Sequence, residues 1–153
     1  MKKIIISILL IFFQNLAYSK GDLTRQKPQE VKINFVSKPG SSHFFSPAEI
    51  ELETGILYKL ILKNNSPNKH YFSSLKFPDA VFTRKVQVVD GTNKIAEIKG
   101  HIKEVEVFPG FSVEWWLIPI KTGVFDDLHC RVLDKIADME HKDMGMRGKI
   151  VVK

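Results

Sequence analysis

Apolar and polar residues alternate along most of this chain in short runs, and turn-forming residues separate the runs. Alternation with a period of two places every second side chain on the same face of the backbone, which is typical of half-buried β-strands. The predicted strands share this pattern and cover residues 31–35, 50–52, 56–62, 70–72, 85–89, 105–107, 111–120, 124–132 and 149–152. Proline and glycine mark turns between them, as at 38–42 and 108–110.

The number and spacing of these strands predict an all-β fold, a Greek-key β-sandwich or barrel of about seven to eight strands. The strand 111–120 has apolar side chains on both faces, including Trp115 on one and Trp116 on the other. This predicts a strand that is covered on both sides. Two short helices are expected near 78–83 and 134–140, where the alternation is lost.

The N-terminus has the organisation of a secretory signal peptide. Lys2 and Lys3 precede the apolar run 4–13, and residues 17–19 form a small-x-small cleavage sequence. The apolar run is too short for a membrane-spanning helix. We therefore expect cleavage after Ser19 and export to the bacterial periplasm, with no membrane span left in the mature protein.

Once the signal peptide 1–19 is removed, the rest of the chain has the size of one domain with its own core. Residues 20–30 are polar and are predicted to be a flexible lead-in to the domain 31–153. The whole sequence has 23 basic and 17 acidic residues, and loss of two N-terminal lysines leaves a net charge of about +4. The basic residues are spread out rather than clustered, which argues against nucleic acid as a partner.

Cys130 is the only cysteine, so it cannot form a disulfide within the chain. An exported protein exposes a free thiol to oxidation, and ligation to a metal is one reason for such a thiol to persist. An inert buried cysteine is the alternative. On a regular strand, Val124, Leu128 and Cys130 would share one face, and the neighbouring His129 would point to the other.

Other potential metal donors accompany this cysteine. His141, Met144 and Met146 follow it within one short stretch, and His70 follows a strand-like run far upstream. One thiolate, two imidazoles and a weak axial thioether form the trigonal ligand set that suits copper in electron-transfer sites. A β-sandwich can bring such residues together at one end, which predicts a single copper site there. A two-copper centre is disfavoured, because only one cysteine is present.

Several short segments have the sequence and order found in cupredoxins. They are Asn64-Asn65 before His70, His70-Tyr71-Phe72 followed by 84–87, Pro109-Gly110, 119–123 before the cysteine strand, and His141 with Gly145-Met146 and Gly148. On these segments, residues 50–153 resemble the small periplasmic plastocyanin-like proteins with a blue-copper site. The resemblance implies a cupredoxin-like fold and one copper ion held by His70, Cys130, His141 and an axial Met146, with Met144 as the alternative axial ligand.

The chain departs from the cupredoxin pattern between two of the implied ligands. Ten residues separate Cys130 from His141, whereas family members usually have only a few. The extra segment 131–140 either projects as a short helix and leaves the ligands in place, or lengthens the loop and alters the site. Of the remaining histidines, His43 and His101 lie in loop-like segments and are expected to be exposed to solvent.

These observations leave three functional hypotheses. The first is a one-electron carrier that meets a redox partner protein, for which a monomer is expected. The second is an accessory protein for copper or iron acquisition that passes the ion to a chaperone; Met139, Met144 and Met146 could give it a looser copper(I) site. The third is a metal-free cupredoxin fold that binds other proteins. An enzyme is not expected, because the sequence has no catalytic motif and a single candidate copper site lacks the further metals needed to reduce oxygen.

Overall fold

The computed structural model describes residues 21–153, so the predicted signal peptide lies outside the described residues. The predicted lead-in 20–30 contains a short 3₁₀ turn, η1 (Leu23–Arg25), and the first residues of β1 (Gln29–Lys38). None of the helical elements among the described residues has the length and apolar character needed to cross a membrane.

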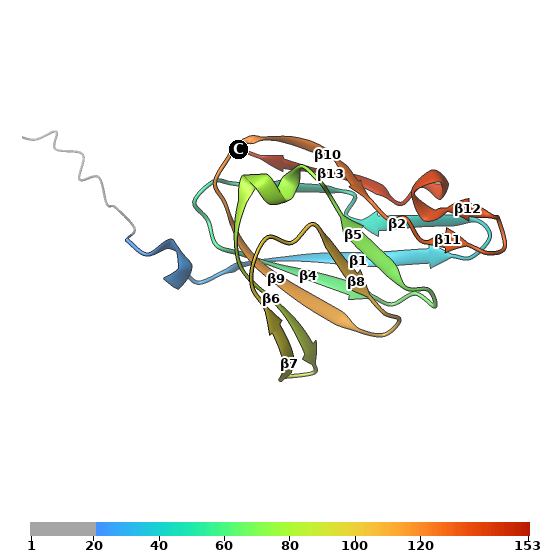
Figure 1. The fold of residues 1–153 in the computed structure, drawn as a ribbon, viewed down its shortest axis with the longest axis horizontal. Coiled ribbons are helices and arrows are strands. Elements are labelled where there is room, and N and C mark those ends of the chain that lie inside the picture. Colours follow the sequence, from blue (N-terminus) through green and yellow to red (C-terminus); the bar gives the residue numbers. More distant parts are fainter. Residues whose placement is uncertain (1–20) are drawn as a thin grey trace, which may run out of the picture.

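Two β-sheets pack face to face and form a sandwich (Figure 1). The six-stranded sheet has, in spatial order, β2 (Ser42–Ser46), β1, β4 (Tyr58–Asn64), β9 (Ser112–Pro119), β6 (Val81–Asp90) and β7 (Asn93–Ile98). The five-stranded sheet has β3 (Glu49–Leu52), β13 (Arg147–Val152), β10 (Gly123–His129), β5 (His70–Ser73) and β8 (Glu104–Val107). The predicted all-β sandwich is confirmed, although residues 21–153 contain thirteen strands once the short pair β11 (Leu133–Asp134) and β12 (Met139–Glu140) is included.

The core lies between the two sheets and follows the alternation of the sequence. Ile33 in β1 and Leu60 in β4 are completely buried, while the residues beside them are partly or fully exposed. Trp115 in β9 is 2% exposed, and its ring packs edge-on against Phe72 of the opposite sheet. Trp116 is half-buried on the outer face of β9, which lies between β4 and β6. Burial of each large apolar side chain stabilises the fold by about 1.5–3 kcal/mol.

One of the two expected helices is present and the other is not. The segment near 78–83 begins with η2 (Phe77–Ala80), a single 3₁₀ turn. The helix predicted at 134–140 was wrong, because these residues form the end of β11, the turn and β12 of the β11–β12 hairpin. The carboxylate of Asp134 accepts the backbone N–H groups of Ile136 and Ala137, and this stabilises a turn rather than a helix.

The strand that leads to Cys130 contains a β-bulge. Its pairing with β13 shifts register between Phe125 and Leu128. Phe125, Leu128 and Cys130 are therefore buried, whereas Val124 is 63% exposed. The prediction that Val124 shares a face with Cys130 was wrong, because a bulge adds one residue and reverses the alternation on one side of it.

Candidate metal centre

Three donor atoms from distant parts of the sequence meet at one end of the sandwich. The sulfur of Cys130 lies 3.7 Å from Nδ1 of His70 and 3.6 Å from Nδ1 of His141. The two Nδ1 atoms lie 3.0 Å apart. All three residues have no exposed surface. The structure thus brings together the thiol and both imidazoles that the sequence indicated.

The five-stranded sheet and the loop that follows it position these residues. His70 is the first residue of β5, Cys130 directly follows β10, and His141 is the first residue of η3 (His141–Met144). β5 and β10 are antiparallel neighbours, so the start of β5 at His70 and the residue after β10, Cys130, lie at the same end of the sheet. In addition, the backbone N–H of Tyr71 donates to the sulfur of Cys130 over 3.3 Å. Such a bond stabilises a thiolate.

The long spacing between Cys130 and His141 is accommodated by a β-hairpin. The segment 131–140 leaves the site as β11 and returns as β12, so that its two ends remain adjacent (Figure 1). The backbone N–H of His141 donates to the carbonyl oxygen of Val132 over 2.8 Å, and that of Lys142 donates to the carbonyl oxygen of Cys130 over 2.9 Å. The insertion therefore projects without separating the two side chains.

The methionines differ in burial. Met146 is completely buried, and its carbonyl oxygen accepts the backbone N–H of Cys130 over 3.1 Å. Gly145 precedes it with a φ of 107°, a left-handed conformation that glycine adopts easily, and ends η3. Met144 is half-buried within η3, and Met139 on the hairpin is 45% exposed. Of the two axial candidates, Met146 is the one that is completely buried.

A network of polar side chains holds His70. Its Nε2 lies 2.8 Å from the hydroxyl of Ser66. That hydroxyl in turn donates to the side-chain oxygen of Asn64 over 2.7 Å. Because the Nε2 edge of the ring is occupied in this way, Nδ1 is the nitrogen that faces Cys130 and His141. Asn64 thus contributes to the orientation of a histidine six residues further along the chain.

His43 is a residue of the centre that the sequence analysis missed. The expectation that it is exposed was wrong, because it lies on β2 with its side chain inward and has no exposed surface. Its ring stacks on that of His141, with centroids 3.7 Å apart and planes inclined by 19°. A signal was present in the sequence: His43 and Phe45 follow the turn 38–42 at the spacing of two that marks one face of a strand.

Burial keeps both facing imidazoles neutral. Desolvation, with the neighbouring histidines as a smaller cause, lowers the pKa of His70 to about 3 and that of His141 to about 4. A neutral ring nitrogen has a free lone pair for a metal. Burial also raises the pKa of the Cys130 thiol, so binding of a metal to the thiolate releases a proton near neutral pH.

The donor atoms fit a small transition-metal ion. The three distances between them define a triangle whose corners all lie about 2.0 Å from its centre. Metal–nitrogen bonds are about 2.0–2.1 Å long and metal–sulfur bonds about 2.3 Å, so Cys130, His70 and His141 are close enough together to hold one such ion. Sulfur and neutral imidazole donors together suit copper in both of its common oxidation states.

A second combination of residues, His43 with His70 and His141, also offers nitrogen atoms within 4.8 Å of one another. Both nitrogens of His43 are occupied, however, since Nε2 lies 2.9 Å from a carboxylate oxygen of Asp134 and Nδ1 lies 2.7 Å from the hydroxyl of Ser37. The set with Cys130 has free donor atoms and is therefore the better ligand set.

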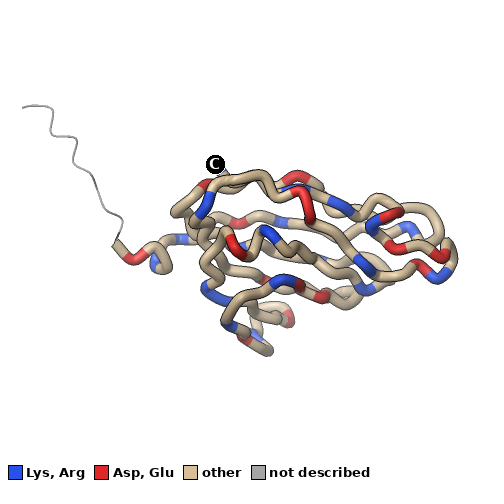
Figure 2. The backbone as a smooth tube through the Cα atoms, turned by 45° about the horizontal axis from the view of Figure 1, so that its top comes forward, with Lys and Arg blue, Asp and Glu red and all other residues tan. Residues whose placement is uncertain are grey.

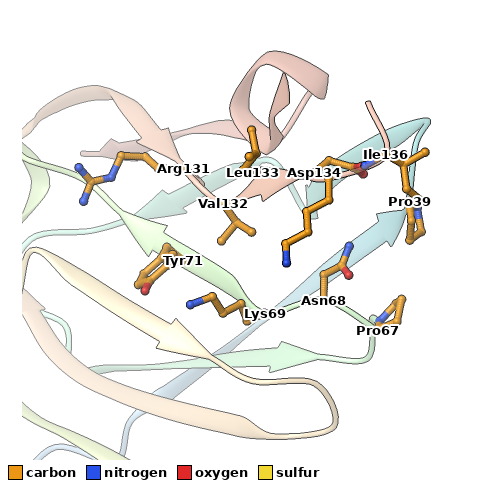
Figure 3. Close-up of a pocket in the computed structure, with 11 residues that line it drawn as sticks. Pro39, Pro67, Asn68, Lys69, Tyr71, Arg131, Val132, Leu133, Asp134 and Ile136 are labelled. Carbon is orange, nitrogen blue, oxygen red and sulfur yellow. The ribbon is translucent and has the colours of Figure 1, made fainter. Parts of the chain in front are cut away.

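A cleft of about 600 Å³ lies beside the centre (Figure 3). Tyr71 and Val132 contribute to its wall, and these residues follow His70 and Cys130 closely in sequence. Three basic residues line it, of which two are paired: Lys69 with Glu106 at 2.8 Å and Arg131 with Glu104 at 2.9 Å. The third is Lys135. Figure 2 shows acidic and basic residues interspersed over residues 21–153.

The remaining histidines lie outside the donor cluster. His101 is exposed and its Nε2 lies 2.8 Å from the carboxylate of Asp79. His129 is half-buried, and its Nδ1 lies 2.7 Å from the backbone oxygen of Asp127. His129 is thus tied to its own strand, although it is the immediate neighbour of Cys130.

The sequence matches no protein-family model and no curated protein. Solved structures share the fold. They include a multicopper oxidase from Pediococcus acidilactici, with a TM-score of 0.57 and 15% identity over 84% of this chain and 27% of that chain. A copper nitrite reductase from Nitrosomonas europaea has a TM-score of 0.56 and 13% identity over 85% of this chain and 51% of that chain. A multicopper oxidase from Aquifex aeolicus has a TM-score of 0.57 and 16% identity over 84% of this chain and 30% of that chain.

These neighbours identify the fold as cupredoxin-like, in agreement with the resemblance seen in the sequence. The chain spans between about a quarter and a half of the length of the neighbours. The expectation from the sequence that this protein is not an enzyme was wrong. The neighbours are oxidases and a nitrite reductase by name, so enzymes are among the proteins that share this fold.

Proposed function

We propose that this chain is a copper-binding cupredoxin-like protein that carries single electrons through one type-1-like copper site. The observation that carries the proposal is the convergence of Cys130, His70 and His141 through their sulfur and Nδ1 atoms in a buried cluster. Copper proteins among the structural neighbours are consistent with it.

Each residue of the proposed site has its own role as a metal donor. The thiolate of Cys130 would be the soft donor, the imidazoles of His70 and His141 would complete a trigonal set, and Met146 would be the weak axial donor. When bound, copper supplies the one-electron couple between its (I) and (II) states. The buried and hydrogen-bonded side chains exclude water and hold the same donor geometry for both states, which keeps electron transfer fast.

Location and partners are further parts of the proposal. The signal-peptide sequence supports export to the periplasm, where a redox partner protein would exchange electrons with the monomer. The cleft beside Tyr71 and Val132 offers a route of approach close to Cys130. Because all three donor residues are fully buried, retention of the ion is favoured over rapid transfer to a copper chaperone.

Titration of the metal-free protein with copper(II) tests the proposed site. We expect saturation at one ion per chain and an intense visible band from charge transfer between Cys130 and the ion. An H101Q variant, which changes an exposed histidine away from the centre, should give the same spectrum. Binding without the intense band, or ready loss of the ion to a competing chaperone, would speak for the trafficking hypothesis, and no binding for the metal-free one.

A further inference from the structure

The two histidines of the donor cluster are held in different ways. His70 has the hydroxyl of Ser66 at its Nε2, as described above. The Nε2 atom of His141 is buried as well, but it has no hydrogen-bond partner among residues 21–153. Histidines that bind metals almost always have a hydrogen-bond partner on the other ring nitrogen, which fixes the orientation of the ring. Another contact must therefore fix the plane of His141.

His43 supplies this contact. Its ring lies nearly parallel to the ring of His141 at a centroid distance of 3.7 Å. His43 cannot rotate freely, because the hydroxyl of Ser37 donates to Nδ1 and Nε2–H donates to the carboxylate of Asp134. Both bonds fix one tautomer and one ring plane. The ring of His43 is thus a fixed, flat surface on which the ring of His141 lies.

Asp134 is itself firmly held. Its two carboxylate oxygens accept the backbone N–H groups of Gly40, Ile136 and Ala137 in addition to the imidazole of His43. Gly40 belongs to the turn between β1 and β2, whereas Asp134 belongs to the hairpin inserted between Cys130 and His141. The inserted hairpin is therefore connected to the neighbouring turn, and both lie at the same end of the molecule (Figure 1).

We propose that His43 is a positioning residue, which is clamped by Asp134 of the inserted hairpin and fixes the imidazole plane of His141 by stacking. The unusual segment 131–140 then has a function: it supplies the carboxylate that holds His43 in place. This inference rests on the proposed copper site for its consequences, but the stacking itself concerns the protein alone.

A matched pair of substitutions isolates the flat ring. H43F and H43L both remove the hydrogen bonds to Ser37 and Asp134, and both place an apolar side chain in the buried site. Only phenylalanine retains an aromatic face towards His141. We expect H43L to weaken copper(II) binding by about 10–100-fold, the usual effect of removing a residue that supports a metal ligand. H43F should retain most of the copper affinity of the wild type and the position of its visible band.

A measurement on the metal-free protein separates this inference from the proposed function. Nuclear magnetic resonance of the His141 ring should show one fixed orientation in the wild type and in H43F, and ring motion in H43L. If the wild type bound no copper, the ring signals would still test the stacking. If H43L fails to fold, D134N serves instead, because it keeps His43 but weakens the hydrogen bond that holds it. We expect motion of the His141 ring in D134N as well, but less than in H43L.

Two results would overturn the inference. One is a rigid His141 ring in folded H43L or D134N. The other is an equal loss of copper affinity in H43F and H43L, which would show that His43 has only a general role in packing.

Discussion

Replacement of Cys130 by serine is expected to abolish the intense visible band of the copper-loaded protein and to weaken copper binding by more than about 100-fold. The estimate follows because loss of a mere supporting residue already costs about 10–100-fold in affinity. A hydroxyl oxygen is a poor substitute for the thiolate, since it remains protonated and is a harder donor. Serine has nearly the shape of cysteine, so the fold should persist. Optical and isothermal titrations with copper(II) measure both effects.

The neighbouring residue offers a matched control for this substitution. His129 is adjacent in sequence but is bonded to the backbone oxygen of Asp127 rather than to the donor cluster. H129Q should therefore keep the band and the affinity of the wild type. An intense band in folded C130S would show that the sulfur of Cys130 is not the ligand responsible for it.

The metal-free protein is expected to lose stability steeply as the pH falls from about 6.5 to about 4. Histidine in the unfolded chain titrates near pH 6.5, whereas burial lowers the pKa of His70 to about 3 and that of His141 to about 4. Across this window the unfolded state binds two protons that the folded state excludes, so acid favours unfolding. The free energy of unfolding should fall by up to about 2.7 kcal/mol per pH unit, and well above pH 6.5 these two groups contribute no slope.

Chemical denaturation at several pH values measures this slope. In H141Q one of the two titrating groups is absent, so the slope should be roughly halved. H101Q should retain the slope of the wild type, because it removes an exposed histidine outside the cluster. A free energy of unfolding that stays constant between pH 6.5 and 4.5 would contradict the neutral, buried state assigned to both imidazoles.

The sequence pattern was sufficient for the fold class and for three of the residues at the centre. Alternation identified most strands, and the unusual combination of one cysteine with two histidines in a chain predicted to be exported singled out Cys130, His70 and His141. Gly148 was also noted as part of the cupredoxin pattern, and the structure gives the reason: a Cβ atom there would lie 2.5 Å from the carbonyl oxygen of Ala48.

Other features depend on contacts that no local pattern contains. The bulge after Phe125 comes from pairing with β13, and a period of two cannot locate it. The segment 131–140 has helical composition, but the hydrogen bonds of Asp134 to its own turn favour a hairpin. The importance of His43 follows from its contact with His141, a residue almost a hundred positions away, which only the folded chain brings within reach.

X-ray absorption spectroscopy at the copper edge, together with a crystal structure of the copper-loaded protein, tests the central claim most directly. The account predicts one ion bonded to the sulfur of Cys130 and to Nδ1 of His70 and His141, with His43 stacked and unbonded. An ion held by the nitrogens of His43, His70 and His141 without a sulfur ligand would contradict it.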